Sequence, residues 1–156
     1  VVGVFKAYTT RVGNGPYPTE LTGELGEQIR QAGGEFGSTT GRPRRTGWLD
    51  LPALDYACLI NGVTELAITK VDVLSGMDEV QVCNAYENKG EQITTADGTE
   101  SAESITPVYD TLPGWQTDGS GEDAALERYL KLIEKRVNVP VKHVSFGPGR
   151  EQLVAR

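Results

Sequence analysis

The sequence predicts an α/β protein with a mostly parallel sheet and flanking helices. Short apolar segments rich in β-branched residues alternate along the chain with segments of helical periodicity, and Gly or Pro interrupts the chain between them. The 156 residues suffice for one domain with a hydrophobic core and are too few for two. The net charge of −7, from 15 basic and 22 acidic residues, argues against a nucleic-acid partner and against a membrane partner.

The first elements are a strand, a loop and a helix. Residues 1–8 are apolar enough for a buried strand, and residues 9–18 are interrupted by Gly and Pro. A helix should follow and end at residues 33–34, which are both Gly. Its apolar positions fall on one stripe: Leu21, Leu25, Ile29 and Ala32.

Asp50 is typical of a residue that caps the start of a second helix. Pro52 would lie in the first turn, Leu54 and Cys58 on the apolar side, and Gly62 at the end. The later predicted elements are an apolar strand in 65–72, a strand at 80–86, a turn at 88–90 into a short strand near 93, a surface excursion at 94–104, a helix at 122–137 and a last strand at 141–145.

The most informative segment is a basic loop, residues 37–50, expected between the two helices. Thr39 and Thr40 can donate hydroxyl hydrogen bonds, and flanking Gly residues allow backbone N–H groups to approach an anion. Arg42, Arg44 and Arg45 bring planar guanidinium groups suited to carboxylate or phosphate. On an acidic protein this predicts a site for a small anionic ligand. The alternative is a solvated basic turn.

Two further polar segments follow predicted strands, where open α/β sheets bind ligands. Asp72 could accept hydrogen bonds from N1–H and the exocyclic amine of guanine, and Lys70, expected on the same side of the strand, could pack along the base. Ser145 and Gly147 could present backbone N–H groups to a base carbonyl. The alternatives are a surface Lys–Asp pair and a simple Gly-Pro turn. If the ligand sites are real, Arg44 and Asp72 should share one cleft.

Other catalytic and metal motifs are missing from the sequence. No Gly-x-x-x-x-Gly-Lys-Ser/Thr phosphate loop occurs, and the single His143 lies in a predicted strand, where packing is the simpler role. Cys58 and Cys83 lack the spacing of metal ligands and are expected to be core residues of a reduced, cytoplasmic protein.

Several motifs occur in an order that resembles the adenylosuccinate synthetase family across essentially the whole chain. The most specific is Thr39-Thr40-Gly41-Arg42-Pro43-Arg44-Arg45-Thr46-Gly47-Trp48-Leu49-Asp50. The others are KAYTTRVGNGP at 6–16, TKVDVL at 69–74, PVY at 107–109, LPGW at 112–115 and SFGPGR at 145–150.

The resemblance implies a ligase that uses GTP and Mg²⁺ to phosphorylate the 6-oxygen of IMP, which L-aspartate then displaces to give adenylosuccinate in purine biosynthesis. It also implies a fold like that of P-loop NTPases and a homodimer. By residue, it implies that the loop Ser38–Arg44 closes on aspartate. The residues implied for aspartate and IMP are Val12, Ser38, Thr39, Thr40, Gly41, Arg42, Pro43 and Arg44. Those implied for GTP are Arg44, Lys70, Val71, Asp72, Ser145, Phe146 and Gly147.

The family's N-terminal phosphate loop, general base, general acid and metal ligands have no counterpart in this sequence. We therefore expect residues 1–156 to be one C-terminal fragment that supplies the aspartate loop and guanine recognition, with no catalytic or metal-binding residue of its own, and to be inactive alone. The absence of an initiator Met fits this expectation. The alternative is a non-catalytic purine-nucleotide-binding or interaction module.

Overall fold

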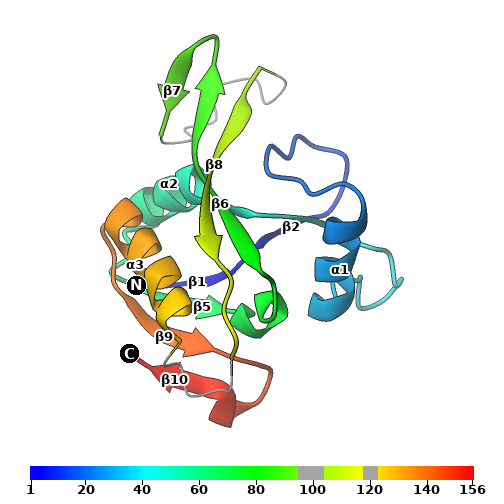
Figure 1. Cartoon of the computed structure of the whole chain (residues 1–156), viewed down its shortest axis with the longest axis vertical. Helices are drawn as coiled ribbons and strands as arrows, with labels where there is room; N and C mark the ends of the chain where they lie inside the picture. Colours follow the sequence, from blue (N-terminus) through cyan, green and yellow to red (C-terminus); the bar gives the residue numbers. More distant parts are fainter. Residues whose placement is uncertain (95–103, 118–122) are drawn as a thin grey trace.

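Two four-stranded sheets, a two-stranded ribbon and three α-helices form the computed structural model, which describes residues 1–94, 104–117 and 123–156 (Figure 1). The elements are β1 (Val2–Lys6), β2 (Thr9–Arg11), α1 (Glu24–Gly33), β3 (Arg45–Gly47), β4 (Leu49–Asp50), α2 (Leu51–Asn61), β5 (Glu65–Thr69), the 3₁₀ turn η1 (Val71–Leu74), β6 (Glu79–Asn88), β7 (Glu91–Ile93), β8 (Thr106–Pro113), α3 (Ala124–Val137), β9 (Val141–Ser145), the 3₁₀ turn η2 (Arg150–Gln152) and β10 (Leu153–Ala155).

The first sheet has the strand order β1-β5-β9-β10. β1 pairs with β5 and β5 with β9 in parallel, and only β10 is antiparallel, as the sequence predicts for a mostly parallel sheet. Lys6 pairs with Thr69, and Ile68 pairs with Val144. The carboxyl ends of three neighbouring strands therefore lie at one edge, and the chain after each of them can contribute to a common site.

The second sheet departs from the predicted parallel pattern. β4 is parallel to β6, but β7 and β8 are both antiparallel to β6, and the long β6–β8 pair extends beyond the rest of the molecule (Figure 1). The sequence analysis did not predict β8, which contains Pro107 and Pro113. Its one described neighbour is β6, so these prolines sit on an edge strand, where a missing N–H is tolerated. Residues 95–103 of the predicted excursion lie outside the described residues.

Helix α1 begins later than its apolar stripe predicts. Leu21 donates its backbone N–H to the Thr46 carbonyl at 2.9 Å, so the chain before Glu24 follows β3 instead of a helix. The buried residues of α1 are Gly26, Ile29 and Gly33, whereas Leu25 is 36% exposed. Position 26 must be small because a Cβ there would lie 2.1 Å from the Leu21 carbonyl oxygen. The left-handed Gly34 ends the helix, as predicted.

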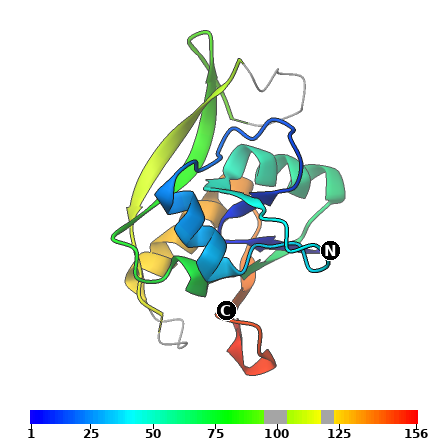
Figure 2. The ribbon, with the colours of Figure 1, turned by 90° about the vertical axis from the view of Figure 1, so that its right-hand side faces the viewer.

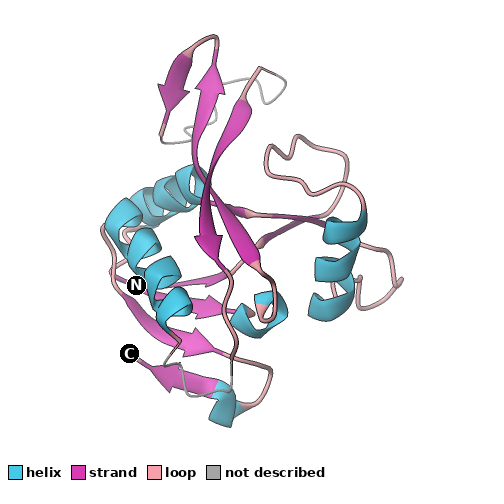
Figure 3. Ribbon diagram, viewed as in Figure 1, coloured by secondary structure: helices cyan, strands magenta, loops and turns pink. Residues whose placement is uncertain are grey.

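The other two helices agree with the sequence. The Asp50 carboxylate accepts the Ala53 N–H at 3.1 Å and caps α2, which Gly62 ends in the left-handed conformation. α2 and α3 pack on each other, whereas α1 lies apart from them (Figures 1 and 2). The predicted basic loop is shorter than expected because β3 and β4 form within it; Figure 3 shows the loop that remains between α1 and β3.

Two aromatic residues fix the chain at the carboxyl ends of β5 and β1. Trp115 and Tyr129 are fully buried and pack with their ring centroids 4.9 Å apart. The Trp115 indole donates to the Val71 carbonyl at 2.9 Å, and the Tyr129 hydroxyl donates to the Ala7 carbonyl at 2.6 Å. These two bonds hold the chain immediately after β5 and β1.

Candidate functional site

The basic loop forms one wall of a cavity of about 600 Å³. The opposite wall comes from the segment after β2, including Val12, whose side chain is 71% exposed. Gly41 does not line this cavity; its φ of +65° lets the loop reverse direction. The described lining consists of Arg11, Val12, Gly13, Asn14, Gly37, Ser38, Thr39, Thr40, Arg42, Pro43, Arg44 and Arg45.

The loop has a hydrogen-bonded base. The Arg44 N–H donates to the Glu35 carbonyl at 3.0 Å, and the Gly37 N–H donates to the Arg42 carbonyl at 2.8 Å. The Arg30 side chain also donates to the Arg44 carbonyl at 2.7 Å. Arg44 therefore stands at the fixed base of the loop, whereas Thr39 and Thr40 stand at its exposed tip.

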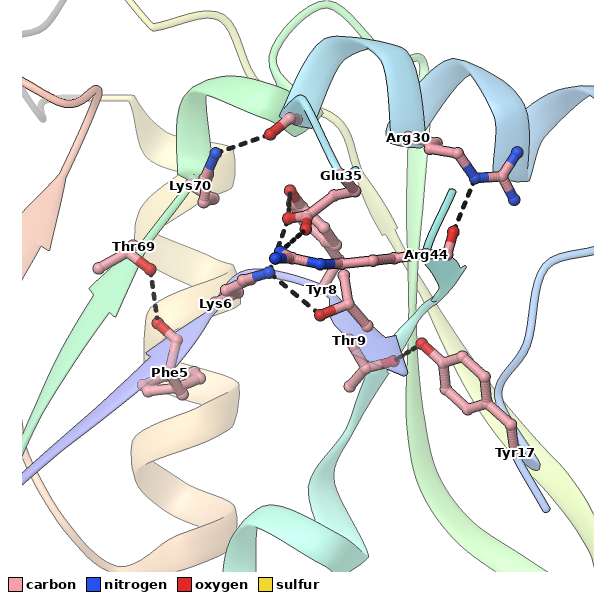
Figure 4. A network of polar contacts seen from close by, with 12 residues as sticks. Phe5, Lys6, Tyr8, Thr9, Tyr17, Arg30, Glu35, Arg44, Thr69 and Lys70 are labelled. Atoms are coloured by element: carbon pink, nitrogen blue, oxygen red, sulfur yellow. Dashed lines mark hydrogen bonds and ion pairs between the residues drawn. The ribbon is translucent and has the colours of Figure 1, made fainter. Parts of the chain in front are cut away.

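Glu35 is a buried carboxylate with three side-chain donors, and the sequence analysis did not single it out (Figure 4). Its side chain is 2% exposed. Oε1 accepts from Lys6 Nζ at 2.6 Å and from the Tyr8 hydroxyl at 2.7 Å, and Oε2 accepts from Arg44 Nη1 at 2.9 Å. Burial alone would raise the pKa of this carboxyl, but the hydrogen bonds from Lys6, Tyr8 and Arg44 outweigh it and lower the pKa.

The lowered pKa predicts a pH-dependent contribution of Glu35 to stability. The ionised carboxylate contributes fully above its ordinary pKa of 4.5, and the contribution is lost as the pH falls through the lower folded value. Glu35→Gln should therefore reduce the free energy of unfolding by about 1–3 kcal/mol at pH 7, and the difference should shrink below about pH 4.5. Denaturant unfolding of both proteins between pH 7 and below pH 4.5 would measure the difference in unfolding free energy. A difference that does not change with pH would contradict the lowered pKa of Glu35.

Arg45 differs from the expectation that all three arginines face a ligand. Its guanidinium forms a bidentate pair with Glu20 at 2.5 and 2.8 Å, and Nη1 donates to the carbonyls of Gly13 and Gly15 at 2.9 and 2.6 Å. These partners use its donors to hold the segment after β2. These four bonds leave Arg45 a single N–H, so Arg42 and Arg44 are the arginines of the loop with several donors left for an anion.

A second cavity, of about 340 Å³, lies at the carboxyl ends of β5 and β9. Lys70 is in the left-handed conformation with a φ of +63°, and η1 follows it. The predicted strand alternation is therefore wrong at this point, because a turn brings Lys70 and Asp72 to the same cavity. The described lining consists of Ala32, Thr69, Lys70, Asp72, Val73, Ser145, Gly147 and Pro148.

Asp72 has an unpaired oxygen at this second cavity. Its Oδ1 is buried and has no hydrogen-bond partner within the described residues. A buried carboxylate oxygen without a donor costs free energy, so a ligand that donates there would bind favourably. Lys70 Nζ donates to the Gly33 carbonyl at 2.8 Å, which fixes the lysine beside the cavity.

The remaining residues expected at the base site lie differently. Ser145 Oγ donates to the Gly147 carbonyl at 2.8 Å, and both residues line the cavity. Val71 and Phe146 are buried in the core, outside the described lining. The Val71 carbonyl and the Phe146 N–H are already bonded, to Trp115 and to the Gln152 carbonyl respectively.

The two cavities are separate, whereas the sequence analysis placed Arg44 and Asp72 in one cleft. The two cavities lie on either side of the C-terminal end of α1, since Ala32 lines the smaller cavity and Gly37 lines the larger one. The Tyr8 hydroxyl donates to Glu35, which also accepts from Arg44, and neither Tyr8 nor Glu35 is in the described lining of either cavity. The Tyr8 hydroxyl has a raised pKa, caused first by burial, then by the hydrogen bond to Glu35, and further by the charge of Asp72. Arg44 thus contacts this buried pair directly, whereas Asp72 acts on the Tyr8 hydroxyl through its charge.

Residues 1–94, 104–117 and 123–156 also contain two cysteines and one histidine. Among the described residues, no group of three or more His, Cys, Asp or Glu could hold a metal ion. Cys58 and Cys83 are free and buried, and His143 is half-buried in β9. No described helix is both long enough and apolar enough to cross a bilayer.

Comparisons with known proteins agree on one family. The family model for adenylosuccinate synthetase matches residues 1–154. Adenylosuccinate synthetase 2 of Methanosarcina acetivorans is 50% identical over 97% of this chain and 38% of its own length. The chloroplastic adenylosuccinate synthetase of Chlamydomonas reinhardtii is 49% identical over 100% of this chain and 35% of its own length.

A solved structure gives the same result for the fold. Fully ligated adenylosuccinate synthetase from Plasmodium falciparum superposes with a TM-score of 0.91 and 38% identity, over 99% of this chain and 39% of that protein. The chain thus spans somewhat over a third of the length of the relatives it matches. The family match over nearly all of its residues leaves one conclusion: this chain belongs to the adenylosuccinate synthetase family.

Proposed function

We propose that this chain supplies the aspartate loop and the guanine-binding edge of an enzyme that joins IMP and L-aspartate to form adenylosuccinate with the hydrolysis of GTP to GDP and phosphate. The observation that carries the proposal is the buried, donor-free Oδ1 of Asp72 in a cavity at the carboxyl edge of the sheet. Guanine presents two adjacent N–H donors to such a carboxylate, and adenine presents no N1–H. Family membership supports the same assignment.

The guanine base would occupy the cavity at the ends of β5 and β9. Asp72 would accept its N1–H and exocyclic amine, and the Lys70 stem would pack along the base. Ser145 and Gly147 would lie at the 6-oxo side. The buried Val71 and Phe146 would support this edge from within the core.

Aspartate would occupy the larger cavity under the basic loop. Thr39 and Thr40 would donate hydrogen bonds to its carboxylates, and Arg42 and Arg44 would add charge-assisted contacts. Arg42 and Val12 would also border the IMP ribose, and Arg44 would lie near the GTP phosphates. Ser38, Gly41 and Pro43 would shape the loop as it closes. The chemistry is a phosphoryl transfer that makes the IMP 6-oxygen a good leaving group, followed by attack of the aspartate amine.

The rest of the enzyme would join at the free edge of the first sheet, with residues 1–156 forming its C-terminal part. β1 is an edge strand, and Val2 and Val4 on it are 49% and 71% exposed. Leu59 and Ile60 of α2 are also exposed, at 74% and 61%. An edge strand and apolar side chains of this kind need a covering segment. The phosphate loop, the general base, the general acid and the Mg²⁺ ligands would belong to that part.

We also propose a cytoplasmic homodimer for the complete enzyme. The two free, buried cysteines support a reducing compartment, although the Chlamydomonas relative is by name chloroplastic. Sedimentation of the complete enzyme would test the dimer. The alternative of a non-catalytic binding module is not favoured, because the chain matches named synthetases throughout its length.

The decisive experiment is a product assay on the complete polypeptide that contains residues 1–156. With IMP, L-aspartate, GTP and Mg²⁺ we expect adenylosuccinate and GDP in equal amounts by chromatography, and we expect no product from residues 1–156 alone. Omission of aspartate should abolish both products of the overall reaction. GTP turnover without adenylosuccinate, or no turnover at all, would count against the proposal.

A further inference from the structure

The base of the basic loop is held by a carboxylate that belongs to neither cavity lining. Glu35 does not line either cavity among the described residues, and its side chain is 2% exposed. It nevertheless contacts Arg44, which lines the larger cavity, through a 2.9 Å ion pair. A buried group that touches a binding residue but not the ligand can only act through that residue.

Arg44 is fixed by this pair in a way that Arg42 is not. Its backbone N–H and carbonyl are bonded to Glu35 and Arg30, and its guanidinium is bonded to Glu35. Arg42 is exposed, and its contacts are made by the backbone with Gly37 and Thr40. Since a guanidinium has five N–H donors, one bond to Glu35 orients Arg44 and leaves donors for a substrate.

The charges at Glu35 favour this arrangement. Lys6 and Arg44 are two cations on one carboxylate, so the cluster keeps a net positive charge beside the cavity. Because Lys6 Nζ, the Tyr8 hydroxyl and Arg44 all donate to it, the carboxylate is held in a single position. An orientation fixed before binding lowers the entropy lost when the substrate binds.

Resting on the proposed function, we infer that Glu35 is a positioning residue, which holds the Arg44 guanidinium in the orientation that binds a carboxylate of the aspartate substrate. The guanine side should not depend on the Glu35 side chain, because Lys70 is anchored on the backbone carbonyl of Gly33. Loss of the Glu35 charge should therefore affect aspartate and spare base selection.

The test is a double-mutant cycle in the complete enzyme. Glu35→Gln keeps the shape of the side chain and removes its charge, and it should raise the KM for aspartate about five- to twentyfold, with the KM for IMP and the preference for GTP over ITP unchanged. In an Arg44→Leu background the same change should raise the KM for aspartate no further. Glu134→Gln is the matched control. Glu134 lies on α3, and its carboxylate also accepts a hydrogen bond from an arginine, Arg156.

Each result bears on the inference separately from the proposed function. An unchanged KM for aspartate in Glu35→Gln, or a rise that multiplies fully with that of Arg44→Leu, would overturn the positioning role. A uniform drop in kcat with unchanged KM values would mean that Glu35 only supports folding and would overturn it as well. If Glu35→Gln does not fold, Glu35→Asp is tested instead. It keeps the charge, so it should raise the KM for aspartate by a smaller factor, and again no further in the Arg44→Leu background. Absence of adenylosuccinate from the unsubstituted enzyme would instead reject the proposed function.

Discussion

Asp72→Asn in the complete enzyme is expected to lower kcat/KM for GTP by about 10²-fold and to raise kcat/KM for xanthosine triphosphate. Hydrogen bonds to a charged group contribute about 1.5–3 kcal/mol each, so loss of the carboxylate pairing with guanine corresponds to at least two powers of ten. The Asn amide can still accept the N1–H, but its NH₂ group meets the exocyclic amine of guanine. Xanthine has a carbonyl at that position and accepts from the amide.

The measurement is steady-state kinetics with the two nucleotides at saturating IMP and aspartate. Asp78→Asn is the control, because this substitution makes the same chemical change at an exposed residue outside the described lining of the base cavity. The KM for aspartate should stay constant, since Asp72 does not line the larger cavity. Base preference that is the same before and after the substitution would remove Asp72 from the guanine site.

The elements that the sequence predicts well are those with a local signal. β9 follows from a short segment with two β-branched residues, Val141 and Val144, and α3 from apolar residues at helical spacing. The start of α1 could not be predicted in this way, because it depends on the pairing of Leu21 with Thr46, which is far along the chain. β8 was missed for a similar reason: its prolines indicate a loop locally, but its pairing with β6 makes it a strand.

The candidate site shows the same division. The loop around Thr39 and the strand end at Asp72 are visible from residue type and from their position after predicted elements. Glu35 follows two glycines and has no periodic pattern, so only the fold reveals that Lys6 and Arg44 meet on it. The one available signal was an isolated acidic residue directly before a basic loop.

The separation of the cavities also could not be predicted from the sequence. Strand ends at one edge of a sheet suggest a common cleft, but Arg44 and Asp72 line two different cavities, and Arg44 is bonded to the buried Glu35, which lines neither. Under the proposed function, the base and the amino-acid substrate would then bind in two separate cavities.

Arg44→Leu is expected to raise the KM for aspartate about tenfold or more, because a charge-assisted contact with a substrate carboxylate is lost. Leu removes the guanidinium but keeps an apolar side chain at the loop base, where the backbone N–H of residue 44 still pairs with the Glu35 carbonyl. Glu35 Oε2 loses its donor, but Oε1 keeps Lys6 and Tyr8, so the buried carboxylate stays paired with a cation. The fold should therefore persist, and the defect should be one of binding.

Steady-state kinetics with aspartate varied at saturating GTP and IMP would measure the effect, with Arg128→Leu on the exposed face of α3 as the control for loss of one positive charge. Arg44→Lys should recover only part of the affinity, because an ammonium group cannot form the bidentate contact of a guanidinium. A rise confined to the KM for GTP would place Arg44 with the phosphates alone. Full recovery by Lys would mean that the charge at the loop base matters and its orientation does not.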